Sequence, residues 1–116
     1  MRLAEVSALL GCEVICGNPS GEEHEVAAAF AADLMSDVLA YGAKDSVLIT
    51  GLTSAQVVHT ADVADLRAVI FVCNKKPSPQ VIVVAADLGL PLLSTHQTMF
   101  GACGLLWAAG LRGGQR

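Results

Sequence analysis

The chain carries little charge for its length. Charged residues make up 16% and hydrophobic residues 53% of its 116 residues, against about 25% and about 45–50% in typical soluble domains. The seven Lys and Arg residues are spread along the chain and the net charge is −4, so there is no basic patch to neutralise nucleic-acid phosphates. We therefore expect no nucleic-acid partner. We also expect a second copy of the chain to cover part of the apolar surface, giving a homodimer.

The chain also has no run of about 20 apolar residues of the kind that crosses a bilayer. Its first residues, MRLAEVSALLG, lack the apolar core and small-residue cleavage site of a signal peptide. The four cysteines, Cys12, Cys16, Cys73 and Cys103, lie in or beside apolar segments, as expected of reduced thiols in the cytoplasm. The expectation is a cytoplasmic protein with no membrane partner.

Four catalytic motifs are absent from the sequence. These are the GxxxxGK[ST] phosphate loop, GxGxxG after a strand, the GxSxG nucleophile elbow and the HExxH zinc pair. Their absence argues against an independent NTPase, dehydrogenase, serine hydrolase or zinc protease. We expect no catalytic site, no metal and no cofactor.

What the sequence does contain is a βαβ unit in residues 66–98. An apolar strand (AVIFV) is followed by a polar loop (CNKKPSP), an apolar segment (QVIVVAADLG) and a second strand (PLLST). The β-branched residues 81–84 favour a strand by propensity. However, Ser78-Pro79 is typical of a helix start, Gly89 suits a helix end, and two parallel strands need a crossover. The pattern therefore predicts a helix between two parallel strands.

The other segments alternate in the same way. Residues 2–10 predict a helix closed by Gly11, residues 12–16 a strand, and residues 26–32 an edge or mixed strand that follows an acidic segment at 22–25. The next predicted elements are a helix capped by Asp33 and closed by Gly42, a strand at 46–50, and a helix from a Thr53–Gln56 capping box to about Asp65. A last helix is predicted to be capped by Ser94-Thr95. Its apolar stripe would consist of Met99, Phe100, Cys103, Leu106 and Trp107.

Strands that alternate with helices in this way predict an α/β fold with right-handed crossovers. We expect a small single domain with a mostly parallel sheet and flanking helices. The domain is predicted to span residues 1–111, and the polar, glycine-rich residues 112–116 are predicted to form a disordered tail.

The predicted topology indicates where a ligand would bind. In open parallel sheets ligands bind outside the carboxyl ends of the strands, which here means the loops at 50–53, 73–78 and 94–97. Each loop leads to a helix N-terminus, which favours an anion. The candidate ligand-binding residues in these loops are Thr50, Thr53, Asn74, Lys75, Lys76, Ser94, Thr95 and His96. Two interpretations stay open: a pocket in which Lys75 or Lys76 meets an anionic ligand, or ordinary helix caps beside solvated lysines.

Two residues in these loops could take part in a chemical reaction. His96 is a candidate for acid–base work because it follows a strand at its carboxyl end, but no partner is fixed nearby by sequence, so an ordinary loop histidine is the alternative. Cys73 has Lys75 close by, which makes it the thiol best placed to react, although a structural role is the alternative. Cys12 and Cys16 could bind a metal only if two more ligands converged on them.

Several segments, in this order and spacing, resemble the DRTGG domain family. They are Asp33-Leu34-Met35-Ser36-Asp37-Val38-Leu39, Val69 to Val72, Gly89-Leu90-Pro91-Leu92-Leu93-Ser94-Thr95, Thr98-Met99-Phe100 and Ala102-Cys103-Gly104. The resemblance covers nearly the whole chain, from residue 1 to 111.

The resemblance implies a small α/β module that is similar in fold to the amino-terminal domain of HPr kinase/phosphorylase. Such modules occur alone or attached to other domains, as in CBS-domain proteins and long forms of phosphotransacetylase, where the partner domain performs the chemistry. Ligand sensing or oligomerisation is the usual suggestion for their role. Some stand-alone members are labelled serine kinases, but this chain lacks the phosphate-loop domain that phosphoryl transfer needs.

Three hypotheses about function follow. The first is a non-catalytic regulatory or ligand-binding module, homodimeric, that senses a small anionic metabolite or nucleotide. The second is a structural protein-interaction module with no ligand. The third is a small enzyme that uses His96 or Cys73.

Overall fold

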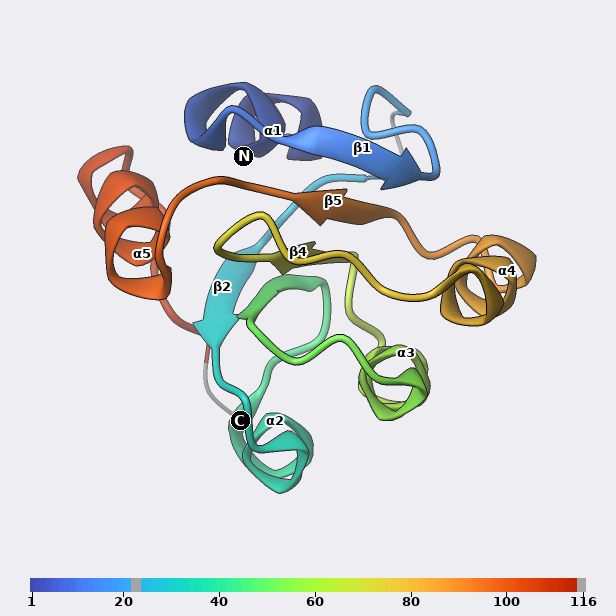
Figure 1. The fold of residues 1–116 in the computed structure, drawn as a ribbon. Coiled ribbons are helices and arrows are strands. Elements are labelled where there is room, and N and C mark those ends of the chain that lie inside the picture. The colour runs from blue at the N-terminus through green and yellow to red at the C-terminus, as the bar shows by residue number, and fades with distance from the viewer. Residues whose placement is uncertain (22–23, 115–116) are drawn as a thin grey trace.

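A five-stranded sheet forms the middle layer of the molecule (Figure 1), with its strands in the order β1-β5-β4-β3-β2. The structure is a computed structural model that describes residues 1–21 and 24–114. Strands β2 to β5 are parallel to their neighbours, whereas β1 is antiparallel to β5. The bounds of the strands are β1 Glu13–Cys16, β2 Ala28–Ala31, β3 Ser46–Thr50, β4 Ala68–Phe71 and β5 Leu92–Ser94.

Helices cover both faces of the sheet. Their bounds are α1 Leu3–Leu10, α2 Met35–Tyr41, α3 Ala55–Val63, α4 Pro79–Asp87 and α5 Met99–Ala108. Strands β2 to β5 follow one another in chain order, so right-handed crossovers place α2, α3 and α4 on the same face. Helices α1 and α5 pack against the other face (Figure 1).

The core has two halves, one on each side of the sheet. Phe71 and Leu48 pack against the α2–α4 layer, while Ile49 and Ile70 pack against α1 and α5. Every residue of β3 and β4 is buried, because these strands lie inside the sheet with helices on both faces. This burial on both faces explains why the sequences of the two strands are mostly apolar.

This architecture confirms the predicted fold class, an α/β domain with a mostly parallel sheet and flanking helices. The segment at 26–32 is confirmed as an edge strand, β2. Helix α4 forms over the β-branched run, with Ser78 at its N-cap position and Pro79 in its first turn. Gly11 closes α1 in the left-handed conformation, as predicted.

The predicted side-chain caps are wrong for three helices. Asp33 does not cap α2, because its carboxylate bonds to Thr50 and Gly51 instead. The Thr53–Gln56 capping box does not form, since Ser54 is the N-cap residue of α3 and makes no side-chain cap bond. Helix α5 is capped by Thr98, whose hydroxyl accepts from Gly101 N at 3.1 Å.

The predicted apolar stripe of α5 is only partly right. Leu106 is buried, but Phe100 is 90% exposed and Trp107 is 60% exposed. The residues that α5 buries are Ala102 and Leu106. Helix α5 therefore shows an apolar surface to solvent on its outer side.

The end of the described chain lies against the sheet edge. Ala29 N donates to Arg112 O at 3.0 Å, and Gly113 forms a parallel bridge with Ala29. Residues 115–116 of the predicted tail, and residues 22–23 of the acidic segment, lie outside the described residues. Within residues 1–21 and 24–114 there is no helix with the length and apolar character needed to cross a membrane.

Candidate functional site

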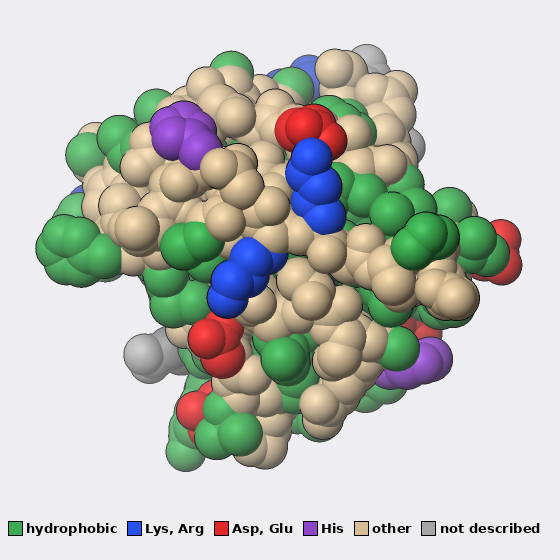
Figure 2. All heavy atoms as spheres, in the orientation of Figure 1, with side chains coloured by type: hydrophobic (Ala, Val, Ile, Leu, Met, Phe, Trp, Pro, Cys, Tyr) green, Lys and Arg blue, Asp and Glu red, His purple; other side chains and the backbone are tan. Residues whose placement is uncertain are grey.

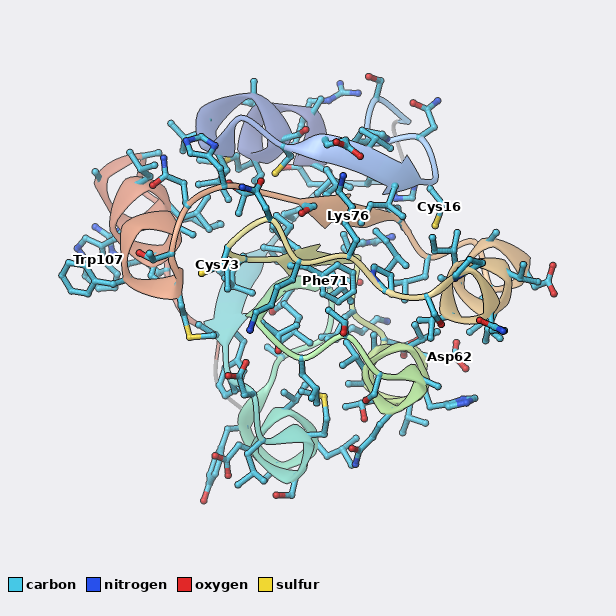
Figure 3. All side chains as sticks on the ribbon, in the orientation of Figure 1. Cys16, Asp62, Phe71, Cys73, Lys76 and Trp107 are labelled. Carbon is cyan, nitrogen blue, oxygen red and sulfur yellow. The ribbon has the colours of Figure 1, made fainter. Side chains whose placement is uncertain are left out.

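The loops that follow β3, β4 and β5 lie at one edge of the sheet, because the three strands are parallel. Cys73 and Lys76 mark the loop after β4 (Figure 3). Charged side chains are sparse on the face that Figure 2 shows, where most atoms belong to backbone, uncharged polar or hydrophobic groups. Each cation on this face therefore has few other charged groups near it that would compete for an anion.

Backbone hydrogen bonds join two of these loops into one unit. Cys73 N donates to Gln97 O at 2.9 Å, and Asn74 N donates to Thr95 O at 2.8 Å. The hydroxyl of Ser94 donates to Lys75 O at 2.9 Å. These bonds use the N–H groups of Cys73 and Asn74, so they are not free to bind an anion. Their effect is to fix the loop that carries Lys75.

The same loop contains two consecutive residues in the left-handed conformation. Cys73 has φ 57° and Asn74 has φ 58°, a conformation that costs an L-residue about 1–2 kcal/mol relative to its right-handed counterpart. Asparagine tolerates it better than most residues, but cysteine has no such preference. Strain of this kind is concentrated at functional sites in proteins.

The two lysines of the loop differ in their surroundings. Lys76 pairs with Glu13, with Nζ 3.0 Å from Oε2. In the described part of the chain, the ammonium group of Lys75 has neither a salt bridge nor a hydrogen bond. It lies beside Gly51, where a Cβ would be only 3.3 Å from Nζ. Of the two candidates, Lys75 is therefore the cation free to bind an anion.

Asp33 belongs to this edge of the sheet, although the sequence interpretation assigned it to a helix cap. Its Oδ1 accepts from Thr50 Oγ1 at 2.9 Å and from Gly51 N at 2.8 Å. The Thr50 hydroxyl in turn accepts from Leu52 N at 3.1 Å, so its proton is directed to Asp33. The signal that could have revealed this contact is the position of Asp33 just after a strand parallel to β3.

Three of the predicted site residues use their hydroxyl groups inside the protein. Thr50 and Ser94 are buried and bond to Asp33 and Lys75 O, respectively. Thr95 is buried, donates to Leu10 O at 2.7 Å and accepts from Gln97 N at 3.2 Å. These residues hold the loops in place, whereas the side chains of Asn74, Lys75 and Lys76 are exposed.

His96 and Thr53 complete the predicted set. His96 is exposed, and its Nε2 lies 3.5 Å from Nε2 of Gln97. Among the described residues, no carboxylate or nucleophile forms a hydrogen bond with the His96 ring. Thr53 is half-buried. The geometry around His96 therefore does not supply the partner that acid–base catalysis would need.

The cysteines lie in different surroundings. Burial raises the pKa of Cys12 to about 11 and also raises the pKa values of Cys16 and Cys103. Cys73 is the exposed cysteine, and it lies on a different strand end from Cys16 (Figure 3). In the ranges 1–21 and 24–114, no three His, Cys, Asp or Glu side chains are arranged to hold a metal ion.

A cavity of about 340 Å³ opens at the opposite, amino edge of the sheet. Its polar lining includes Lys44, Asp45, Asp62 and Arg67, and Arg67 pairs with Asp45 at 3.2 Å. Asp62 lies on α3, away from Cys73 and Lys76 (Figure 3). Asp45 and Asp65 in the lining of this cavity also have positive φ, so backbone strain does not separate the two edges. We give more weight to the carboxyl edge because open parallel sheets bind ligands outside the carboxyl ends of their strands.

Comparison with known proteins relates the chain to a domain family and to solved structures. The model of the DRTGG domain family matches residues 5–107. Among solved structures, the chain is similar to the CBS and DRTGG domains of the regulatory region of Clostridium perfringens pyrophosphatase, complexed with the activator diadenosine tetraphosphate. The TM-score is 0.68 at 14% identity, and the match covers 90% of this chain and 45% of that chain. No curated protein matches in sequence.

Proposed function

Because the chain belongs to the DRTGG domain family, we propose that it is a non-catalytic regulatory module that binds a small anionic metabolite at the carboxyl edge of its sheet. The observation that carries the proposal is the unpaired Lys75 ammonium beside Gly51, on a loop held rigid by its bonds to the β5–α5 connection. A cytoplasmic location stays a prediction.

A phosphorylated compound is the class of ligand that fits best. Lysine binds phosphate as a point charge, and the loops lead to the N-termini of α3, α4 and α5, whose dipoles favour an anion. The similar regulatory region from Clostridium perfringens is complexed with a nucleotide, diadenosine tetraphosphate. This chain spans less than half of that chain, so nucleotides are the first compounds to test rather than an assigned ligand.

Thermal unfolding with a ligand panel tests the proposal. A ligand that binds only the folded state at 100 times its Kd stabilises it by about 2.7 kcal/mol. We expect at least one compound among AMP, ATP, diadenosine tetraphosphate and common phosphorylated metabolites to raise Tm. The rise should be lost in Lys75→Ala.

Lys76→Ala is the matched control, because Lys76 is exposed on the same loop but already paired with Glu13. It should keep most of the response to the ligand. The absence of any shift at millimolar ligand would contradict the proposal. Equal loss in both variants would show that the loop contributes only general positive charge.

A second role, association with another copy of the chain, is favoured by α5. The helix has no charged residue, and Phe100 and Trp107 are exposed on it. Trp107 points away from the sheet (Figure 3). Gly104 lies between them with no atom within 4 Å of a Cβ built there, so a second α5 could approach closely. We propose that this outer face of α5 forms a homodimer interface.

Light scattering at micromolar concentration tests the homodimer. The wild type should have twice the chain mass of 12.0 kDa, and Phe100→Glu should lower the mass to that of a monomer. Val63→Glu is the control, because Val63 is also exposed and apolar but lies on α3. A monomeric wild type would refute the interface. In that case the structural role without a ligand would also lose its support.

A further inference from the structure

The Asp33 carboxylate lies where an anionic ligand would be expected to bind. Its Oδ1 is 2.8 Å from Gly51 N and 2.9 Å from Thr50 Oγ1. A backbone N–H and a hydroxyl are also the donors that commonly bind phosphate oxygens. Asp33 itself is exposed, so solvent and solutes can reach the group that occupies these donors.

The Lys75 ammonium adjoins the same position. A Cβ built on Gly51 would be 3.3 Å from Lys75 Nζ and 3.6 Å from Asp33 Oδ1, so both charged groups border the space that the glycine leaves open. Lys75 and Asp33 do not form a salt bridge, which requires 4.0 Å or less, and Lys75 makes no other bond in the described residues. The glycine does not have a positive φ. Glycine is therefore needed at this position to leave room for the Lys75 and Asp33 side chains, and not to allow a left-handed backbone.

We propose that Gly51 N–H, the Thr50 hydroxyl and the Lys75 ammonium form an oxyanion-binding position, and that the Asp33 carboxylate occupies it until a phosphate-type ligand displaces it. The inference rests on the proposed function in placing the ligand at this edge of the sheet. It adds the donors that bind the ligand, the class of group they bind, and the internal competitor.

Displacement would connect binding to a change in the protein. Asp33 lies between β2 and α2, and its two hydrogen bonds fasten this connection to the end of β3. A ligand that takes over these donors releases Asp33 from the end of β3, while Ala32 N keeps its bond to Ile49 O. The segment from Ala32 to Leu34 is therefore where a binding signal would first appear.

Pyrophosphate titrations followed by amide NMR test the proposal without knowledge of the natural ligand. Asp33→Ala vacates the donors and removes a negative charge. It should bind pyrophosphate about tenfold more tightly than the wild type, because the loss of the like charge and the vacating of the two donors act together. The Gly51 amide should show the largest shift. Adding Lys75→Ala should abolish the gain.

Two further variants complete the design. Asp62→Ala removes the same charge from the exposed surface of α3 and should leave pyrophosphate affinity unchanged. Asp33→Asn keeps an acceptor for Gly51 and Thr50, so it should preserve the fold even if Asp33→Ala does not. It should bind about threefold more tightly than the wild type because only the charge is lost.

Equal pyrophosphate affinity in the wild type, Asp33→Ala and Asp33→Asn would overturn the proposal, as would a gain in Asp62→Ala of the same size. These outcomes are distinct from a failure of the proposed function. If no metabolite stabilises the wild type, the Asp33 variants still report on the oxyanion position. If a metabolite binds but the variants do not differ, the ligand site lies elsewhere.

Discussion

Replacing Cys73 with glycine is expected to stabilise the protein. Cys73 has φ 57°, and an L-residue pays about 1–2 kcal/mol for this conformation, which glycine adopts without a steric penalty. The side chain is exposed, so its removal loses little packing. Glycine gains more backbone entropy on unfolding, which offsets about 0.5–1 kcal/mol. The net gain should be about 0.5–1 kcal/mol, or a rise in Tm of about 2–5 °C.

Urea unfolding and differential scanning calorimetry would measure this gain. Cys73→Ser is the first control, since it removes the thiol but keeps a side chain in the left-handed conformation, and its stability should match the wild type. Lys76→Gly is the second control. Lys76 is exposed on the same loop and has no positive φ, so glycine there should lower stability by about 0.5–1 kcal/mol.

Comparing the stabilities of the two glycine variants tests whether the backbone at Cys73 is strained. If Cys73→Gly destabilises the protein as much as Lys76→Gly does, the left-handed backbone at Cys73 carries no strain. A gain in stability accompanied by a weaker ligand response would instead indicate that the strained conformation is needed to hold Lys75 beside Gly51. Strain retained at a binding loop for this reason is common in proteins.

Two further predictions concern the buried Thr95 hydroxyl and the half-buried Cys12 thiol. Thr95→Val leaves Leu10 O and Gln97 N without the Thr95 hydroxyl, so it should cost about 1–3 kcal/mol in urea unfolding, and Thr95→Ser should recover most of the loss. Burial raises the pKa of Cys12 from 9.0 to about 11, so the unfolded state loses its thiol proton at lower pH than the folded state. Stability should therefore fall as pH rises from 9.0 to about 11. Cys12→Ala should flatten that part of a plot of Tm against pH, and an unchanged slope would contradict the assignment.

The order of strands and helices could be predicted because each element has its own local signal. Strands β3 and β4 are continuous apolar runs, which follows from burial on both faces. Helix α4 shows how signals combine, since its β-branched residues favour a strand but Ser78 and Pro79 mark a helix start. The need for a crossover between β4 and β5 favours the same answer.

The caps could not be predicted as reliably, because a hydroxyl has several possible partners. Thr95 could cap a helix by its sequence position, but its hydroxyl bonds to Leu10 O, 85 residues earlier in the chain. The stripe on α5 failed for a related reason. The segment is apolar all round, so periodicity does not say which side faces the sheet, and Phe100 and Trp107 were assigned to the wrong side.

The contact between Asp33 and Gly51 follows from strand pairing rather than from any motif. In the parallel register of β2 and β3, Ala31 is opposite Ile49, so two residues further along each strand Asp33 comes opposite Gly51. The sequence gives no register for β2, because its small residues AAFA would fit several alignments. Once β3 is known to have β2 on one side and β4 on the other, the loop after β3 must lie between Asp33 and Lys75. The pairing of strands thus brings an anion and a cation to either side of Gly51, and this arrangement makes exchange of the internal carboxylate for an external anion physically possible.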